Sequence, residues 1–465
     1  MRLSGPRAFA IGRALFRPAG KGRRAKPDWA PPSHRLTYGH VADPATGELV
    51  DEVLAAFMRA PHTYTREDVV ELNAHGGPLL LRRILALALA AGARAARPGE
   101  MTLRAFLNGR LDLAQAEAVM ALIQAESEAG LRQALRQLTG DLSARVRAVR
   151  DPAMRAMVHI EASNDFPEDE VDPPDRAALA ALVERARGEV AGLLAGADRG
   201  RLLREGLRVA ILGRPNVGKS SLLNALLRTE RAIVTPISGT TRDTVEETAT
   251  VRGIALHLVD TAGLTASADP IERIGVERSR AAAASADLAL FVLDASEPLT
   301  PADHAAAREL RALGFGRTAD LSDGAFEAAP DATGRPLLLA LNKADLPAAW
   351  DAAAARALWP DVPAVHTSSV ELGGTAALED AIAALVLDGD APGADPLVAS
   401  IRHRDALRRA AAALANASAA LASDTPLDFV ALDLREALDA LGEITGETAT
   451  ADLLDRIFAA FCIGK

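Results

Sequence analysis

One short stretch limits the possible folds of this chain more than any other. Residues 213–220 read Gly-Arg-Pro-Asn-Val-Gly-Lys-Ser, which is the pattern of a phosphate-binding loop (P-loop). The apolar run Leu207–Leu212 before it predicts a buried strand, and residues 221–227 after it predict a helix. A P-loop requires this strand, loop and helix context. The sequence therefore predicts an α/β nucleotide-binding domain.

The residues of this loop have distinct expected roles. Gly213 and Gly218 let the backbone curl so that its N–H groups face a phosphate chain at a helix N-terminus. Lys219 is placed to reach the β- and γ-phosphates, and Ser220 can ligate Mg²⁺. The candidate nucleotide-binding residues of this stretch are Asn216, Val217, Gly218, Lys219, Ser220 and Ser221.

A guanine-recognition motif follows the P-loop in the order that a GTPase requires. The apolar run 337–341 predicts a strand that ends in Asn342, Lys343, Ala344 and Asp345. The Asp345 carboxylate can accept hydrogen bonds from the guanine N1–H and the N2 amine, a donor pair that adenine lacks. Ser368 and Ser369 follow the next predicted strand and fit a second base-contacting loop. The sequence predicts GTP as the nucleotide.

The γ-phosphate end of the site is predicted from the segments between these motifs. A strand at 256–259 ends in Asp260, Thr261, Ala262 and Gly263, where the carboxylate can hold Mg²⁺ through water and the glycine amide can sense the γ-phosphate. A switch loop precedes it, with Thr241 as the second hydroxyl ligand of Mg²⁺. Its candidate nucleotide-binding residues are Thr235, Pro236, Ile237, Ser238, Gly239, Thr240 and Thr241.

The residue that orients the attacking water is not the glutamine of Ras-like proteins. Leu264 stands at that position, and a hydrophobic side chain cannot align water. Hydrolysis in such a site depends on positioning and charge stabilisation, so another group must act. Asp269, Glu272 and Glu277 follow, and the residues alone leave open which of them acts or whether each is a solvated charge.

Composition excludes several other classes of protein. Aromatic residues make up only 3% and hydrophobic residues 49%, which favours helix over an all-β fold. The net charge of −10 gives no global basic surface for nucleic acid, so any RNA contact is local or shared with a partner. Cys462 is the only cysteine, which fits a reducing compartment. We expect a cytoplasmic protein without a membrane span, because arginines interrupt the most apolar segment, 79–96.

The chain divides into segments of different pattern. Strand and turn signals predict a small α+β unit over 1–110, and helical periodicity dominates 111–205 and 385–465. The nucleotide motifs fall in 206–384. Each helical flank alone offers part of a bundle core. We therefore predict a multidomain chain: an α+β N-terminal domain, a helical domain, and an α/β P-loop GTPase domain inserted into the helical domain.

The motifs together resemble the MnmE (TrmE) family of bacterial tRNA modification GTPases. The terminal Phe-Cys-Ile-Gly-Lys of 461–465 makes the resemblance specific, because P-loop GTPases at large lack it. The switch sequence Gly-Thr-Thr-Arg-Asp at 239–243 and Ile-Glu-Arg-Ile-Gly at 271–275 agree. So do N-terminal stretches at 64–71, 75–78, 97–100 and 104–113. The resemblance covers almost the whole chain.

The resemblance implies a function beyond GTP hydrolysis. Members of this family act with the flavoprotein MnmG (GidA), in a heterotetramer or larger complex, on the wobble uridine U34 of certain tRNAs. They add an aminomethyl or carboxymethylaminomethyl group at C5. The one-carbon unit comes from 5-formyl- or methylene-tetrahydrofolate bound to the N-terminal domain of an MnmE homodimer. FAD belongs to the partner only.

The resemblance also assigns residues by motif position. Folate binding falls to Arg2, Glu71, Arg110 and Lys465, which is chemically reasonable because a folate offers a pterin edge and a glutamate tail. K⁺ in place of an arginine finger supports hydrolysis across dimerised GTPase domains, with Asn216, Thr235, Ile237 and Thr240 as ligands. Glu272 orients the attacking water through a second water, and Lys219 and Cys462 complete the catalytic set. An inert, structural Cys462 is the alternative for that residue.

The sequence leaves a departure and some alternatives open. Family members begin earlier, with a strand and a Pro-Gly-Arg-Gly-like loop, so either the start is assigned late or the folate domain is incomplete. A ribosome-assembly GTPase of the Era or Der type would need a KH-like unit or a tandem GTPase domain, and neither is evident. A non-catalytic scaffold in which nucleotide only sets conformation is the other alternative.

Overall fold

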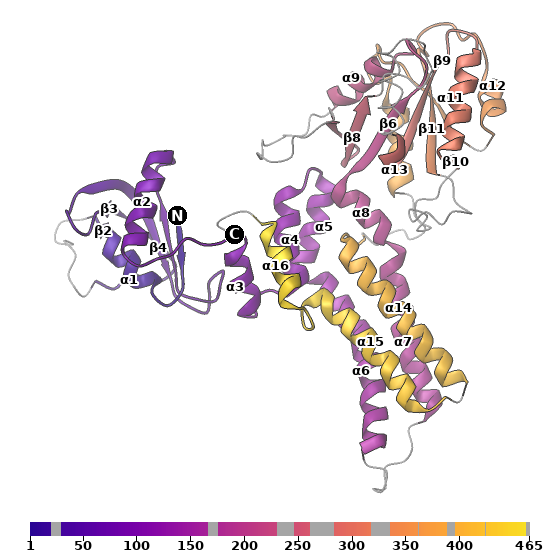
Figure 1. Cartoon of the computed structure of the whole chain (residues 1–465). Coiled ribbons are helices and arrows are strands. Elements are labelled where there is room, and N and C mark those ends of the chain that lie inside the picture. Colours follow the sequence, from indigo (N-terminus) through magenta and orange to yellow (C-terminus); the bar gives the residue numbers. More distant parts are fainter. Residues whose placement is uncertain are drawn as a thin grey trace. The chain divides into compact units, whose positions relative to one another are not determined.

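The computed structural model describes most of the chain (Figure 1). The described residues are 1–19, 29–165, 175–229, 246–260, 283–317, 335–360, 362–387, 396–423 and 425–461. They form two compact units, one of residues 1–120 with 445–465 and one of residues 121–444. The division into four segments made above remains a prediction. Within the described ranges, no helix has both the length and the apolar character needed to cross a membrane.

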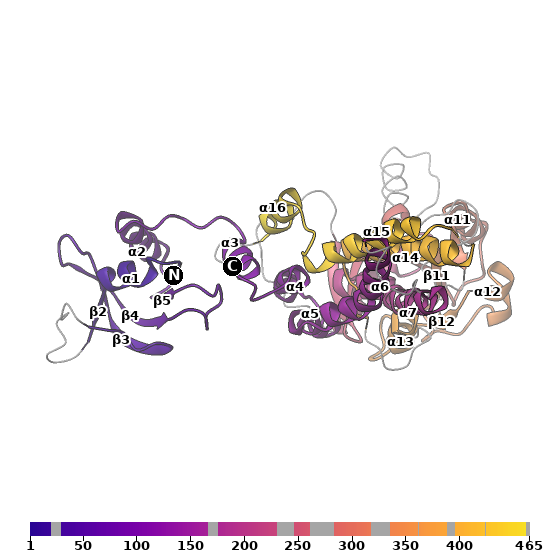
Figure 2. The same cartoon turned by 90° about the horizontal axis from the view of Figure 1, so that it is seen from below.

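The first unit is built on a five-stranded antiparallel sheet in the order β1-β5-β4-β3-β2. Its elements are β1 (Arg2–Ser4), α1 (Ala8–Leu15), β2 (Phe16–Pro18), β3 (Arg35–Ala42), β4 (Leu49–Met58), β5 (Val69–Asn73), α2 (Pro78–Ala90), α3 (Glu100–Leu107) and α16 (Ala451–Ala459). Helix α4 (Leu113–Gln124) crosses from this unit into the second. In Figure 2, α1 and α2 lie on the same face of the sheet.

Alternation along the strands explains this one-sided packing. Val53, Ala55 and Phe57 of β4 are buried with residues of α1 and α2, whereas Glu52 and Leu54 point to the other face and are exposed. Among the described strands, β1 pairs only with β5 and is an edge strand, in a register that places Arg2 opposite Glu71. The fold thus brings together two residues assigned to folate by motif position.

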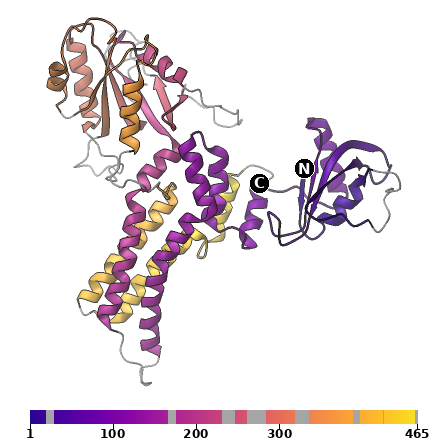
Figure 3. The same cartoon turned by 180° about the vertical axis from the view of Figure 1, so that it is seen from behind.

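Long helices form part of the second unit. They are α5 (Glu128–Thr139), α6 (Asp141–Asp165), α7 (Arg176–Ala195), α8 (Ala197–Glu205), α14 (Ile401–Ala422) and α15 (Leu427–Thr445). Helix α7 packs on both α6 and α14, and in Figure 3 the yellow α14 lies along the magenta α7. The Gln133 Nε2 donates to the Pro396 carbonyl at 2.9 Å, which ties the early helices to the start of the later ones. Segments before and after the nucleotide motifs therefore share one bundle.

An α/β domain lies between these helical segments in sequence. Its elements are β6 (Leu207–Leu212), α9 (Lys219–Thr229), β7 (Glu246–Val251), β8 (Ile254–Asp260), β9 (Leu288–Asp294), α11 (Pro301–Ala312), β10 (Phe315–Arg317), β11 (Arg335–Asn342), α12 (Ala352–Leu358), β12 (Ala364–His366) and α13 (Ala376–Leu387). The seven-stranded sheet has the order β10-β11-β9-β6-β8-β7, with β12 paired to β11. Only the pairing of β7 with β8 is antiparallel among the described strand pairs of this sheet.

Helices cover both faces of this sheet, so its central strands are mainly apolar. Every residue of β9 is buried. One face packs on α9 and α13, and the other packs on α11 and α12. Continuous apolar runs are expected for parallel strands buried on both faces. The predicted fold class is confirmed: an α+β unit, a helical part and an inserted P-loop α/β part.

Candidate functional site

The carboxyl ends of β6, β9 and β11 bring the predicted nucleotide motifs to one edge of the sheet. The P-loop follows β6, and the guanine motif follows β11. Strand β9 lies between them, pairing with β6 on one side and β11 on the other. Open parallel sheets bind ligands outside the carboxyl ends of their strands. The motifs therefore converge where such a fold places a nucleotide.

The P-loop has the backbone geometry that its sequence predicts. Gly213 has φ +152° and Gly218 has φ +96°, while Asn216 adopts φ +65°, a left-handed conformation that asparagine tolerates better than most residues. A Cβ at Gly218 would lie 2.3 Å from the Asn342 Nδ2. Only glycine therefore lets the P-loop approach the guanine motif this closely. Helix α9 begins at Lys219, inside the motif, so its first N–H groups face the loop.

The P-loop lysine lies over the backbone of its own loop. Lys219 is 8% exposed, and its Nζ donates to the carbonyls of Gly213 at 3.0 Å and Arg214 at 2.8 Å. The ammonium is thereby held at the mouth of the loop, where a phosphate chain would meet it. Ser220 and Ser221 follow it in the first turn of α9.

The guanine motif is fixed by hydrogen bonds to both neighbouring loops. The Asn342 Nδ2 donates to the Val217 carbonyl at 2.9 Å, which ties the motif to the P-loop. The Ser369 Oγ donates to the Asn342 Oδ1 at 3.1 Å, and the Ser368 Oγ donates to the Asp345 Oδ1 at 2.8 Å. The structure thus joins the two segments that sequence analysis assigned to the base. Asp345 itself is exposed, so its carboxylate is accessible to a ligand.

Several predicted residues lie outside the described residues. Strand β8 ends at Asp260, but nothing is described of the side chain of that residue. The others in this group are Thr235, Pro236, Ile237, Ser238, Gly239, Thr240, Thr241, Thr261, Ala262, Gly263, Glu272, Cys462 and Lys465.

In the first unit, Arg2 and Arg110 contact the ring of Tyr64, and Glu71 pairs with Arg2. The Arg2 Nε donates to the Glu71 Oε1 at 2.7 Å. The guanidinium carbons of Arg2 and Arg110 lie 5.6 Å and 4.8 Å from the centre of the Tyr64 ring, within the range of cation–π contacts. The Arg110 Nη1 also donates to the Tyr64 carbonyl at 3.0 Å. Sequence analysis did not assign a role to Tyr64; its place in the motif at 64–71 was the available signal.

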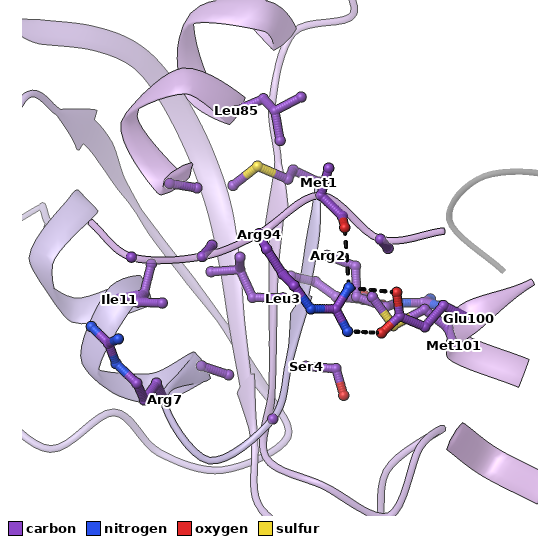
Figure 4. Close-up of a pocket in the computed structure, with 18 of the residues that line it drawn as sticks. Met1, Arg2, Leu3, Ser4, Arg7, Ile11, Leu85, Arg94, Glu100 and Met101 are labelled. Atoms are coloured by element: carbon purple, nitrogen blue, oxygen red, sulfur yellow. Dashed lines mark hydrogen bonds and ion pairs between the residues drawn. The ribbon is translucent and has the colours of Figure 1, made fainter. Parts of the chain in front are cut away.

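A pocket of about 710 Å³ borders this group beside the edge strand β1 (Figure 4). Arg2 and Glu71 line it with apolar residues that include Leu3, Ile11 and Leu85. Figure 4 shows Arg94 at the pocket with its guanidinium paired to Glu100. The pocket thus combines apolar surface with arginines that are paired to carboxylates.

Glu100 is the centre of a charged network on one side of the pocket. The ion pair with Arg94 lowers the pKa of Glu100 most, and burial opposes this change. The Arg97 N–H and the Arg104 guanidinium, each at 2.9 Å, lower the pKa further. The net result is a pKa of about 2. Arg104 also pairs with Glu67 at 3.0 Å, and the Ser4 Oγ donates to Glu67 at 2.7 Å. The network connects α3 to the end of β1. None of these carboxylates was singled out from the sequence.

Comparison with known proteins identifies the family of this chain. Residues 1–110 match the family described as GTP-binding protein TrmE N-terminus, and residues 113–462 match the MnmE helical domain. The tRNA modification GTPase MnmE of Chloroflexus aurantiacus is 50% identical over 479 residues, which cover 100% of this chain and 96% of that protein. The chain belongs to the MnmE family.

Other MnmE proteins are similar over the same extent. Those of Levilactobacillus brevis and Geobacillus kaustophilus are each 44% identical, over 100% of this chain and 95% and 96% of their own lengths. Among solved structures, the G domain of the T. maritima FeoB iron transporter matches 38% of this chain and 98% of that chain, with 24% identity and a TM-score of 0.28. Membership of the MnmE family rests on the sequence comparisons.

Proposed function

We propose that this chain is a GTPase that acts with an MnmG flavoprotein in modifying the wobble uridine U34 of certain tRNAs. The product carries an aminomethyl or carboxymethylaminomethyl group at C5. The observation that carries the proposal is the 50% identity over the whole chain to a protein named tRNA modification GTPase MnmE. The convergence of P-loop and guanine motif at one sheet edge supports the GTPase part.

GTP is proposed to bind across the ends of β6, β9 and β11. Lys219 takes the β- and γ-phosphates, and Asp345 takes the guanine N1–H and N2 amine. Asn342 supports this site by holding the P-loop through Val217. A buried lysine beside the N-terminus of a helix provides the positive potential that a triphosphate needs.

The metal ions of the proposal are Mg²⁺ and K⁺. Ser220 and Thr241 hold Mg²⁺, and Asn216 binds K⁺ together with Thr235, Ile237 and Thr240 when two GTPase domains meet. The exposed, left-handed Asn216 is compatible with that role, because its side chain is not packed in the core. The cations supply positive charge to the transition state. Glu272 is proposed to orient the attacking water.

The one-carbon donor is proposed to be a folate bound in the N-terminal unit. Arg2, Glu71, Arg110 and Lys465 are the proposed ligands, and we add Tyr64 to them. The Tyr64 ring contacts both arginines and can offer a stacking surface to a pterin. The Glu71 carboxylate can accept from the pterin N–H groups while keeping its bond to Arg2.

The proposed assembly is a homodimer that joins MnmG and tRNA in the cytoplasm, with FAD on the partner.

Cys462 is proposed to take part in uridine modification. The test for that residue is Cys462→Ser, with GTP hydrolysis and uridine modification scored separately. Loss of modification alone supports a chemical role, and retention of both refutes it.

The overall proposal is tested by complementing a bacterial strain that lacks MnmE and analysing its tRNA nucleosides by mass spectrometry. The wild-type chain should restore C5-modified wobble uridine. Arg2→Ala should lose this modification while GTP hydrolysis continues, because it removes a folate ligand distant in sequence from the GTP motifs. Arg83→Ala is the matched control, since Arg83 forms only an exposed ion pair with Glu48 among the described contacts.

The outcomes separate the open alternatives. If the wild-type chain hydrolyses GTP but does not restore the modified uridine, the tRNA-modification proposal fails and a scaffold role replaces it. If Arg2→Ala retains full modification, the folate assignment of Arg2 is wrong. If hydrolysis itself is absent, the GTPase proposal fails.

A further inference from the structure

Asp294 occupies a central place between the proposed nucleotide motifs. It is the last residue of β9, the strand that lies between β6 with its P-loop and β11 with its guanine motif. The register places Asp294 opposite Asn342. The side chain of Asp294 therefore lies at the ligand-binding edge of the sheet. No sequence motif marked it.

The Asp294 carboxylate is buried, with hydrogen bonds at one oxygen and an ion pair at the other. Its side chain is 1% exposed, and the Oδ2 lies 2.6 Å from the Lys343 Nζ. The Oδ1 accepts from the Ser296 N–H at 2.9 Å and from the Ser296 Oγ at 2.6 Å. Burial alone would raise the pKa of Asp294, but the bonds from Lys343 and Ser296 outweigh burial and lower it. The group is thus a fixed anion at neutral pH.

The backbone around this carboxylate is fixed as well. The Trp350 Nε1 donates to the Asp294 carbonyl at 3.0 Å, and the Ala295 N–H donates to the Asn342 carbonyl at 2.9 Å. Rotation of the carboxylate would break its bonds to Ser296, so its second oxygen is held toward Lys343. Ordering a long lysine side chain costs conformational entropy. Because Asp294 already orders Lys343 in the folded protein, this entropy is not lost when the nucleotide binds.

We propose that Asp294 is a positioning residue of the guanine site, which acts by holding the Lys343 ammonium. The proposal rests on the proposed GTP function, because Lys343 is part of the guanine motif. Pre-ordering of a binding-site side chain increases affinity by removing an entropic cost of binding. Asp294 itself does not contact the nucleotide; its effect on affinity passes through Lys343.

The test is a double-mutant cycle read by the affinity for a fluorescent GDP analogue. Asp294→Asn keeps an oxygen that can accept from Ser296 but removes the charge that holds Lys343. It should lower the affinity about tenfold in the unmodified chain. In the Lys343→Met background the same change should alter the affinity less than about twofold, because the residue through which Asp294 acts is gone.

Further variants keep the test decisive. Asp380→Asn removes an exposed ion pair with Arg252 in the same domain and should leave the affinity unchanged. If thermal unfolding shows that Asp294→Asn does not fold, Ser296→Ala takes its place. That change removes the Oγ bond to the carboxylate and leaves the N–H bond, so Asp294 is held less firmly, and GDP binding should weaken about threefold, again only while Lys343 is present.

The outcomes test the role of Asp294 separately from the proposed GTP function. An equal loss of affinity with and without Lys343 means that Asp294 acts through general stability, and it overturns the proposal. So does an unchanged affinity of a folded Asp294→Asn chain. If the unmodified chain binds no guanine nucleotide, both the GTP function and the role of Asp294 are refuted.

Discussion

At the scale of single residues, the described sites depend on carboxylates held by arginine or lysine. Glu100 carries two guanidinium partners, and Asp294 carries the Lys343 ammonium. A buried carboxylate without a partner is strongly destabilising, so the partners decide whether the site folds. The ionisation of these groups therefore connects site geometry to stability.

Glu100 gives a prediction for the pH dependence of stability. Its pKa is about 2 in the folded protein, below the usual value of 4.5. A lowered carboxyl pKa adds stability above the unfolded pKa, and this stability is lost as pH falls from about 4.5 toward 2. At pH 7, Glu100→Gln should lower the free energy of unfolding of the first unit by roughly 2–3 kcal/mol.

The measurement is urea unfolding followed by tryptophan fluorescence, in a background that carries Trp350→Phe and Trp359→Phe. Trp29 then reports alone, and its ring lies 5.7 Å from that of Phe57 in the core of the first unit. The difference in unfolding free energy between this background and its Glu100→Gln variant should shrink as pH falls from about 5 to about 3. Glu48→Gln, in an exposed pair, is the control. A difference that is constant with pH would contradict the prediction.

At the scale of elements, close helix contacts require glycine at some helical positions and not at others. Gly200 lies in α8, and a Cβ there would meet the Val398 carbonyl at 1.9 Å. Gly188 lies in α7, where a Cβ would meet nothing within 4 Å. Packing therefore requires a glycine at the first position but leaves room for a side chain at the second.

Alanine substitution should separate these two glycines. Gly200→Ala should destabilise the second unit by about 1–3 kcal/mol, because backbone atoms cannot move away as a flexible side chain would. Gly188→Ala should stabilise it by about 0.5–1 kcal/mol through helix propensity. Unfolding followed by Trp350 and Trp359 fluorescence measures both. If both substitutions change the unfolding free energy in the same direction, the packing of α8 on the 396–400 segment does not decide their effects on stability.

At the scale of the whole molecule, the proposed dimer makes hydrolysis depend on concentration and on the cation. The GTP hydrolysis rate per chain should rise with protein concentration in KCl and stay at least about tenfold lower in NaCl of equal ionic strength. Steady-state phosphate release measures this. Equal rates in the two salts, or a rate per chain independent of concentration, would refute K⁺-dependent dimerisation.

Asn216→Gly tests the proposed K⁺ ligand within that assembly. Glycine adopts the φ of +65° that Asn216 has, so this change removes the side-chain oxygen without straining the loop. The variant should bind GDP normally and lose the difference between KCl and NaCl. A retained difference would exclude Asn216 from the K⁺ site.

The sequence by itself determined the elements and the nucleotide chemistry. An apolar run predicted β6, and helical periodicity over 111–205 and 385–465 predicted the helical character of α7 and α14, because these signals are local. The P-loop and the guanine motif Asn342–Asp345 could be recognised in the sequence, because their chemistry needs fixed spacing along the chain. For Arg2, Glu71 and Arg110, the resemblance to a family was needed, since isolated charges carry no spacing signal.

Only the tertiary structure decided which distant side chains meet. The order β11-β9-β6 places Asp294 beside Lys343, and the pairing of β1 with β5 places Arg2 beside Glu71. Tyr64 contacts two arginines from different ends of the first unit's sequence. Strand order and register set these contacts, and both depend on packing between segments far apart in the chain. Local pattern cannot encode such contacts, which is why the charged networks around Glu100 and Asp294 emerged from the fold alone.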